Sequence, residues 1–471
     1  MKGINVRLKL LIVAAGLLIP FNGYSGTYLS PVALYNRCYS QITGLRPSVS
    51  DPLTKQVVAR QTDPVVACLQ ALSKGVFNGN GNTTISDISD PEALAVLRNM
   101  HRLHASWFSM KDFTPLDQQN NWWTDGVMDL WDASTPALYI TKALFDVSPS
   151  YKGSLSGNAI YIPVRARMNP TTGAKSNSTA DLFALSPLQF APRGALYGVT
   201  ATAPASANYS IIQNNVSSSG TVTLAGSLGG GLLGNYTYAL MNVIQAEKFA
   251  ADGGTQMPRR WGRAVYHDLL CRDLPVVRNS EADAFVVMGS SVPFRNTSNC
   301  TSCHASMDRM ASVVRNVKYT AFGNNSMNVG QRGAFFVNFP AATMPAETAW
   351  PSAADPDYAK RPPTGTLFFR NYMGNLVDIG VSGPSDLAAQ ITNQDDFYIC
   401  AAKRYYSHFT GISVDTSDIY DPKHLELSAD AMAHRNEVIN LGKSLRQHNS
   451  LRKLISDILN SPQYHRSDSA L

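Results

Sequence analysis

The sequence predicts a mainly α, multidomain protein. A helical N-terminal domain is followed by a Ser/Gly-rich middle region of loops and short strands, and then by further helices with a small β-hairpin. Apolar residues recur at helical period near both ends of the chain, Ser, Gly, Thr and Asn dominate the middle, and two β-rich runs surround Met373-Gly374-Asn375. A length of 471 residues fits about two or three domains.

Residues 1–25 have the layout of a secretory signal peptide. Three basic residues precede an apolar run from Leu10 to about Phe21, and Gly23 and Ser25 suit the −3 and −1 positions of the cleavage site. The run is too short for a membrane span, and no later segment has the necessary apolar length. We therefore expect a soluble mature chain, periplasmic or otherwise exported, without a transmembrane span.

The charge of the chain argues against a nucleic-acid partner. The formal net charge is +6, and removal of the three basic residues of the signal peptide lowers it to +3. Nucleic-acid binding usually requires a concentrated basic face. In this chain Lys and Arg are scattered, and the one dense cluster is MPRRWGR.

The helical N-terminal domain is predicted over residues 26–147. In DPEALAVLRNMHRLHASWF, Asp90 is a suitable N-cap and Pro91 a suitable first helical residue, and the apolar residues that follow recur at helical period. His101 and His104 lie three residues apart on this helix, a spacing able to hold a metal, but no third ligand stands at helical spacing. We therefore predict a structural role for both.

Three further regions complete the organisation. Residues 148–239 form the Ser/Gly-rich middle region and linker, which contains the flexible joint GSLGGGLLG. Residues 240–363 form a helical domain whose Asn-, Gly-, Pro- and Ala-rich end, 321–363, is predicted to be a long loop able to wrap a cofactor. Residues 364–471 form a C-terminal helical domain that begins with the hairpin.

The stretch NTSNCTSCHASMDRM carries the clearest chemistry, with Cys300, Cys303 and His304 in the order Cys-x-x-Cys-His. With six cysteines and nine histidines in the chain, the pattern is expected by chance roughly 0.001 times. Thioether attachment of c-type haem requires two thiols at this spacing, followed by a histidine that binds the iron. The sequence therefore predicts one covalent haem c, in a helical haem-binding domain over 240–363.

Two rival interpretations of the motif fit less well. A structural zinc site needs four Cys or His ligands, and the chain has no second Cys-x-x-Cys. A thioredoxin-like dithiol is expected between a strand and a helix of a parallel-sheet unit, and SSVPFRNTSN is not such a strand.

The sixth iron ligand decides whether the haem carries electrons or binds ligands. Met344, in the loop stretch ATMPAETAWP, is the first candidate, and an ordinary loop methionine is the alternative. Met307 lies one helical turn from His304 and belongs to the same side of the haem. Asp308, next to the haem motif, either caps or hydrogen-bonds a neighbour of a haem propionate, or is a solvated helix residue. The other candidates for the sixth ligand are His267, His408, Met373 and Met310.

Four more cysteines remain, and an exported chain allows them to form disulfides. We pair Cys38 with Cys68, which are close in sequence, and Cys271 with Cys400, which flank the haem motif. Sequence alone permits three pairings, and four inert buried thiols are the alternative.

Four stretches follow one another within about residues 255–465: RRWGRAVYHDLLCRDLP, FRNTSNCTSCHASMD, GTLFFRNYMGNLVDIGVSGPSDLAAQITNQDDFYICAAKRYYSHFTG and LRKLISDILNSPQY. In this order they resemble the planctomycete-type secreted cytochrome c proteins, a family of consecutive domains of unknown function with one haem motif. The matching positions are Arg260, Gly262, Leu269, Leu270, Cys271, Pro275, Cys300, Cys303, His304, Asp308, Cys400, Tyr406, Gly411, Ser461 and Tyr464.

The resemblance implies covalent haem on Cys300 and Cys303 with His304 as the proximal ligand, and it favours a bridge from Cys271 to Cys400. The family usually continues its haem motif with Pro-Leu-Gly and an aromatic residue, whereas this chain has Arg-Met-Ala and a longer segment to the next domain. The resemblance therefore implies nothing about the residues around the distal side of the haem in this chain.

These features predict an exported mono-haem c-type cytochrome that passes single electrons between redox partner proteins of the cell envelope, with residues 26–235 binding a partner. One alternative is a haem enzyme or sensor with an open distal site, and another is a binding protein in which haem is structural. An electron carrier is favoured over an enzyme because no acid/base pair is identifiable near the motif.

Overall fold

The computed structural model describes most of the two ends of the chain. The described residues are 28–76, 90–108, 135–146, 148–157, 228–235, 258–290, 292–315 and 361–467, with short pieces between them. The predicted signal peptide, most of the predicted middle region and Met344 lie outside the described residues.

The fold is mostly helical, as predicted, and its first helices share one way of starting. α1 to α4 each begin with a proline in the first turn, which follows an N-cap Ser or Asp whose side chain accepts a backbone N–H. The predicted start at Asp90 and Pro91 is confirmed. The helices are α1 (Pro31–Thr43), α2 (Pro52–Val58), α3 (Pro64–Ser73), α4 (Pro91–Ala105) and α5 (Thr135–Phe145).

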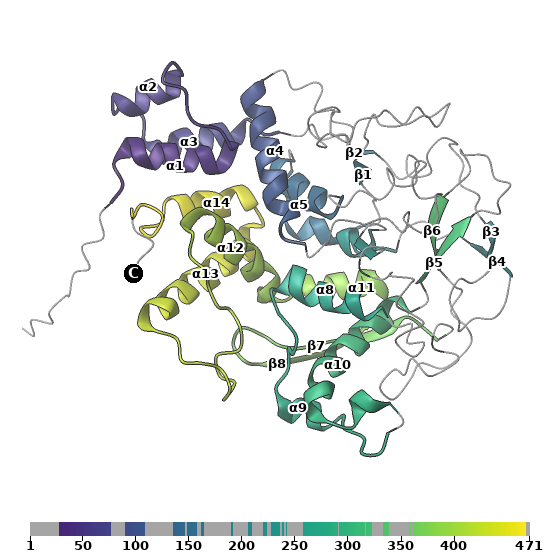
Figure 1. Cartoon of the computed structure of the whole chain (residues 1–471). Coiled ribbons are helices and arrows are strands. Elements are labelled where there is room, and N and C mark those ends of the chain that lie inside the picture. The colour runs from purple at the N-terminus through teal and green to yellow at the C-terminus, as the bar shows by residue number, and fades with distance from the viewer. Residues whose placement is uncertain are drawn as a thin grey trace, which may run out of the picture.

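The second half of the chain supplies the other helices. These are α8 (Arg259–Leu270), α9 (Asn279–Asp283), α10 (Ser298–Ala311), α11 (Gly383–Thr392), α12 (Asp395–Thr410), α13 (Ala429–His448) and α14 (Leu451–Leu459). Figure 1 shows α12 and α14 between the purple N-terminal helices and the teal helices α8 and α10, and α12 contacts both α1 and α8. One hydrophobic core therefore runs from the N-terminal helices to the C-terminal ones.

The predicted hairpin is confirmed as β7 (Thr364–Arg370) and β8 (Leu376–Ser382), which pair antiparallel around a turn at Gly374. A second pair, β5 (Val317–Phe322) and β6 (Gly333–Asn338), enters the stretch that was predicted to be a long loop. That prediction was wrong there because β6 holds the short β-forming run Phe-Phe-Val. Shorter antiparallel pairs are β1 (Ile162–Pro163) with β2 (Phe190–Ala191) and β3 (Ser206–Tyr209) with β4 (Gly220–Thr223).

Helix α10, which carries the Cys-x-x-Cys-His motif, packs between α8 and β7. A Cβ atom at Gly262 of α8 would lie 2.8 Å from the Met307 carbonyl oxygen of α10. On the other side, a Cβ at Gly365 of β7 would collide with the Arg309 carbonyl oxygen. Both contacts are backbone against backbone, so only glycine permits this close approach.

Both predicted cysteine pairings occur in the structure. Cys38 of α1 is bonded to Cys68 of α3 with a Cα–Cα distance of 6.1 Å, and Cys271 is bonded to Cys400 of α12 with a Cα–Cα distance of 5.2 Å. Among the described helices, none has the length and apolar character needed to cross a membrane.

Candidate cofactor-attachment site

The three motif residues lie in the first two turns of α10, which continues past His304 as predicted. The backbone of Thr297 is extended and ends the incoming segment, which contains the short 3-10 helix η9 (Pro293–Arg295). The Thr301 hydroxyl donates a hydrogen bond to the Phe294 carbonyl at 3.0 Å, which fixes η9 against the start of α10. The motif is therefore held on a defined helix start.

The two motif thiols are free. Cys300 is exposed and Cys303 is partly exposed, whereas the other four cysteines form disulfides. Burial raises the pKa of the Cys303 thiol, so that this residue is a neutral thiol at neutral pH. Both sulfur atoms remain open to covalent chemistry.

The His304 ring is oriented by two contacts. Its Nδ1 lies 3.1 Å from Oδ1 of Asp308, and the ring stacks on Phe294 with centroids 3.9 Å apart and an angle of 12° between the planes. An ionised carboxylate only accepts hydrogen bonds, so Nδ1 carries a proton, and in the neutral imidazole Nε2 then has the lone pair. This tautomer is the one in which a histidine binds a metal through Nε2.

Asp308 is itself fixed by a two-pronged ion pair. Its carboxylate is fully buried and accepts from Arg259 Nε at 2.6 Å and from the Arg259 terminal nitrogen at 3.0 Å. Burial by itself raises the pKa of Asp308, but the hydrogen bonds from His304 and Arg259 outweigh it and hold that pKa below its usual range. The Arg259 guanidinium also lies 4.9 Å from the centre of the Phe294 ring.

These four side chains, Arg259, Phe294, His304 and Asp308, form what we call the histidine clamp. Sequence reasoning left Asp308 open as a solvated helix residue, and that alternative is wrong because the carboxylate is buried. Its position four residues after the histidine places both on one helix face, and this spacing was the available signal. Arg259 and Phe294 come from other segments, and no local pattern identified them.

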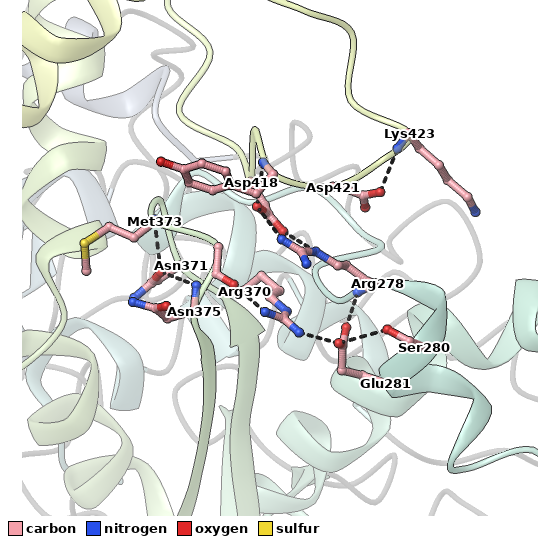
Figure 2. Close-up of polar contacts among 12 residues, drawn as sticks. Arg278, Ser280, Glu281, Arg370, Asn371, Met373, Asn375, Asp418, Asp421 and Lys423 are labelled. Carbon is pink, nitrogen blue, oxygen red and sulfur yellow. Dashed lines mark hydrogen bonds and ion pairs between the residues drawn. The ribbon is translucent and has the colours of Figure 1, made fainter.

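The predicted sixth-ligand candidates within the described residues have different surroundings. Met310 is fully buried in the core, and Met373 is an exposed residue of the β7–β8 turn whose side chain points away from the neighbouring ionic cluster (Figure 2). His267 bonds the carboxylate of the adjacent residue at 2.8 Å, and His408 bonds a carbonyl of α1 at 3.3 Å. Met344 lies outside the described residues.

His101 and His104 serve as structural groups, as predicted. Both are buried and bond the Thr141 hydroxyl of α5, and His104 also bonds the Tyr405 hydroxyl of α12 at 2.6 Å. Burial, with His101 and His408 nearby, lowers the pKa of His104, which therefore stays neutral. Across the described ranges, no three His, Cys, Asp or Glu side chains are placed to hold a metal ion.

Comparisons of the chain with protein-family models, curated proteins and solved structures found no match. The resemblance to the planctomycete-type cytochromes stays a prediction from the order of the motifs. The function is therefore argued from the histidine clamp and the two thiols beside it.

Proposed function

We propose that the protein is an exported mono-haem c-type cytochrome that transfers single electrons between redox partners of the cell envelope. One observation carries the proposal: two free thiols stand immediately before a histidine whose Nδ1 is bonded to a buried carboxylate, which leaves Nε2 for iron. The resemblance in the order of the motifs supports the same assignment.

The residues of the site fit a covalently attached haem. Cys300 and Cys303 would hold it through thioether bonds, and His304 would bind the iron through Nε2. When bound, haem supplies an iron that cycles between the ferrous and ferric states by one electron. Asp308 holds the imidazole in the required tautomer, and Phe294 covers one face of the ring and limits its rotation.

The rest of the proposal concerns export and partners. The secretory layout of the N-terminus supports export, and two disulfides are compatible with an oxidising compartment. The chain is several times longer than one haem requires, so we assign residues 26–235 to partner binding.

The test is an optical spectrum, oxidised and reduced, with and without carbon monoxide, on protein matured in a periplasm with haem-attachment machinery. We expect a low-spin c-type spectrum that carbon monoxide leaves unchanged, because both axial positions are filled in an electron carrier. Ready binding of carbon monoxide would contradict the electron-carrier proposal and favour a haem enzyme or sensor with an open distal site.

Covalent attachment is tested by Cys300→Ala with Cys303→Ala, which should abolish haem staining on a denaturing gel. The matched control is Cys38→Ala with Cys68→Ala, which removes two cysteines far from the motif in sequence and should keep the stain. Staining that persists without the motif thiols would sink the haem assignment.

A further inference from the structure

A cavity of about 440 Å³ opens between the end of α4, the C-terminal end of α8 and one face of α12. We call it the α4–α8–α12 cavity. Leu103 and Trp107 give it apolar surface, and Lys403 and Arg404 give it positive charge. Its volume falls in the range of small-molecule binding sites, and a mixed apolar and charged lining is typical of them.

Lys403 is the unusual group in this lining. It is half-buried, and it makes no hydrogen bond or ion pair with any residue in the described part of the chain. Burial lowers its pKa, and the Asp415 carboxylate opposes that effect from a distance. A half-buried ammonium without a partner is unfavourable, so an anion placed beside Nζ would stabilise it.

Arg404 adds a second cation whose hydrogen-bond acceptors are neutral. Its half-buried guanidinium donates to the carbonyl oxygens of Asp268 at 2.7 Å and of His267 at 3.1 Å. The carboxylate of Asp268 is occupied by His267 and Tyr238 instead. Among the described lining residues the one acid is Asp273, with a side chain that is 76% exposed. Positive charge therefore dominates the interior of the cavity.

The neighbouring cavity of about 380 Å³, which Lys403 also lines, is different. Its arginines are matched by carboxylates: Arg278 donates to Asp418 at 2.7 and 3.0 Å, and Arg370 is paired with Glu281 (Figure 2). Paired charges leave little demand for a ligand. Only in the α4–α8–α12 cavity does Lys403 share the lining with Arg404, whose acceptors are neutral, and this difference points to that cavity as the binding site.

We propose that the α4–α8–α12 cavity binds a small organic carboxylate, with Lys403 and Arg404 beside the carboxylate and with Leu103 and Trp107 against its apolar part. This site is separate from the histidine clamp, and it stands whether or not the chain carries haem. Charge-assisted hydrogen bonds provide the affinity, and the apolar wall distinguishes an organic acid from inorganic phosphate.

The test is calorimetric titration of the full exported chain in a low-salt buffer free of carboxylate and phosphate. Four probes are compared: benzoate, the uncharged benzamide, acetate and inorganic phosphate. We expect benzoate to bind most tightly, and Lys403→Met to weaken it about tenfold or more, because a charge-assisted bond is lost. Lys403→Arg keeps the charge and should keep most of the affinity.

Lys423→Met is the matched control, because Lys423 lines only the neighbouring cavity and should leave benzoate binding unchanged. Lys403→Met removes an unpaired half-buried charge, so its thermal midpoint should equal or exceed that of the wild type, which checks that it folds. The proposal is overturned if benzamide or phosphate binds as tightly as benzoate, if Lys403→Met binds benzoate like the wild type, or if no carboxylate binds.

Discussion

Two kinds of cysteine pair share this chain, and they differ in whether the two cysteines come from different elements or from one helix. Cys38 and Cys68 are fully buried and join two helices across the core. Cys300 and Cys303 stand on consecutive turns of one helix, and both reach the surface as free thiols. Cysteines that meet inside the core fasten helices together, whereas cysteines kept at a helix start stay open to chemistry.

Helix α8 links a disulfide to the helix that carries the two free cysteines. Cys271 caps its C-terminal end in a left-handed conformation with φ of 51° and is bonded to Cys400 of α12. On the same helix, Gly262 lies against the backbone of α10, and Arg259 holds Asp308. The Cys271–Cys400 disulfide therefore fastens the helix that supports the candidate attachment site.

The largest expected effect is the loss of unfolding free energy when a disulfide is removed. Urea unfolding measures it, with the free pair Cys300 and Cys303 as the comparison. The bridge from Cys271 to Cys400 spans 129 residues and that from Cys38 to Cys68 spans 30. A loop-entropy model gives losses of about 5 and about 3.5 kcal/mol when each pair is changed to alanine. A larger loss of unfolding free energy on removing the shorter bridge would contradict this expectation.

The control for this experiment is Cys300→Ala with Cys303→Ala in haem-free protein. These residues lie at the surface and fasten nothing, so the change in unfolding free energy should stay within about 0.5 kcal/mol. A loss comparable with that of a disulfide would show that the free pair also has a structural role.

A smaller loss of unfolding free energy is expected when the contact between α8 and α10 is disturbed. Gly262→Ala places a Cβ 2.8 Å from a backbone oxygen of α10, and relieving that overlap should lower the unfolding free energy by about 1–3 kcal/mol. Gly380→Ala on β8 is the control, because its Cβ meets nothing within 4 Å. Equal stability of the two variants would mean that α8 and α10 are not held at this contact.

The parts of the molecule that the sequence predicted are those set by local pattern. The helix start at Asp90, the hairpin around Gly374 and the continuation of α10 after His304 depend on neighbouring residues. The strand pair β5–β6 was missed because its short β-forming run stands among Asn, Gly, Pro and Ala, whose composition is typical of loops.

The site was predicted only as far as local spacing reaches. The attachment motif is a run of five residues, and Asp308 follows at helical spacing. Arg259 precedes Asp308 by 49 residues, and packing of α8 on α10 brings them together. The unpaired state of Lys403 likewise depends on which helices surround it, so periodicity and composition carry no signal for it.

The last prediction rests on the proposed haem at Cys300 and Cys303, and it tests whether the histidine clamp tunes the potential of the haem iron. Asp308→Asn keeps the shape of the side chain but removes the negative charge that His304 Nδ1 contacts. In protein that carries the proposed haem, the carboxylate would make the imidazole a stronger donor and would favour the ferric state. Its loss should raise the midpoint potential by about 60 mV, the one-electron equivalent of a tenfold change in relative affinity.

Spectroelectrochemical titration measures that potential, and Asp378→Asn is the control. Asp378 lies on β8 and bonds Arg309 of α10, so it neighbours the same helix without contacting the histidine. If both variants shift equally, the effect is a general change of charge near α10. A shift confined to Asp308→Asn locates the tuning at the Asp308 carboxylate, which contacts both His304 and Arg259. An unchanged potential in both variants leaves the carboxylate with only a positioning role.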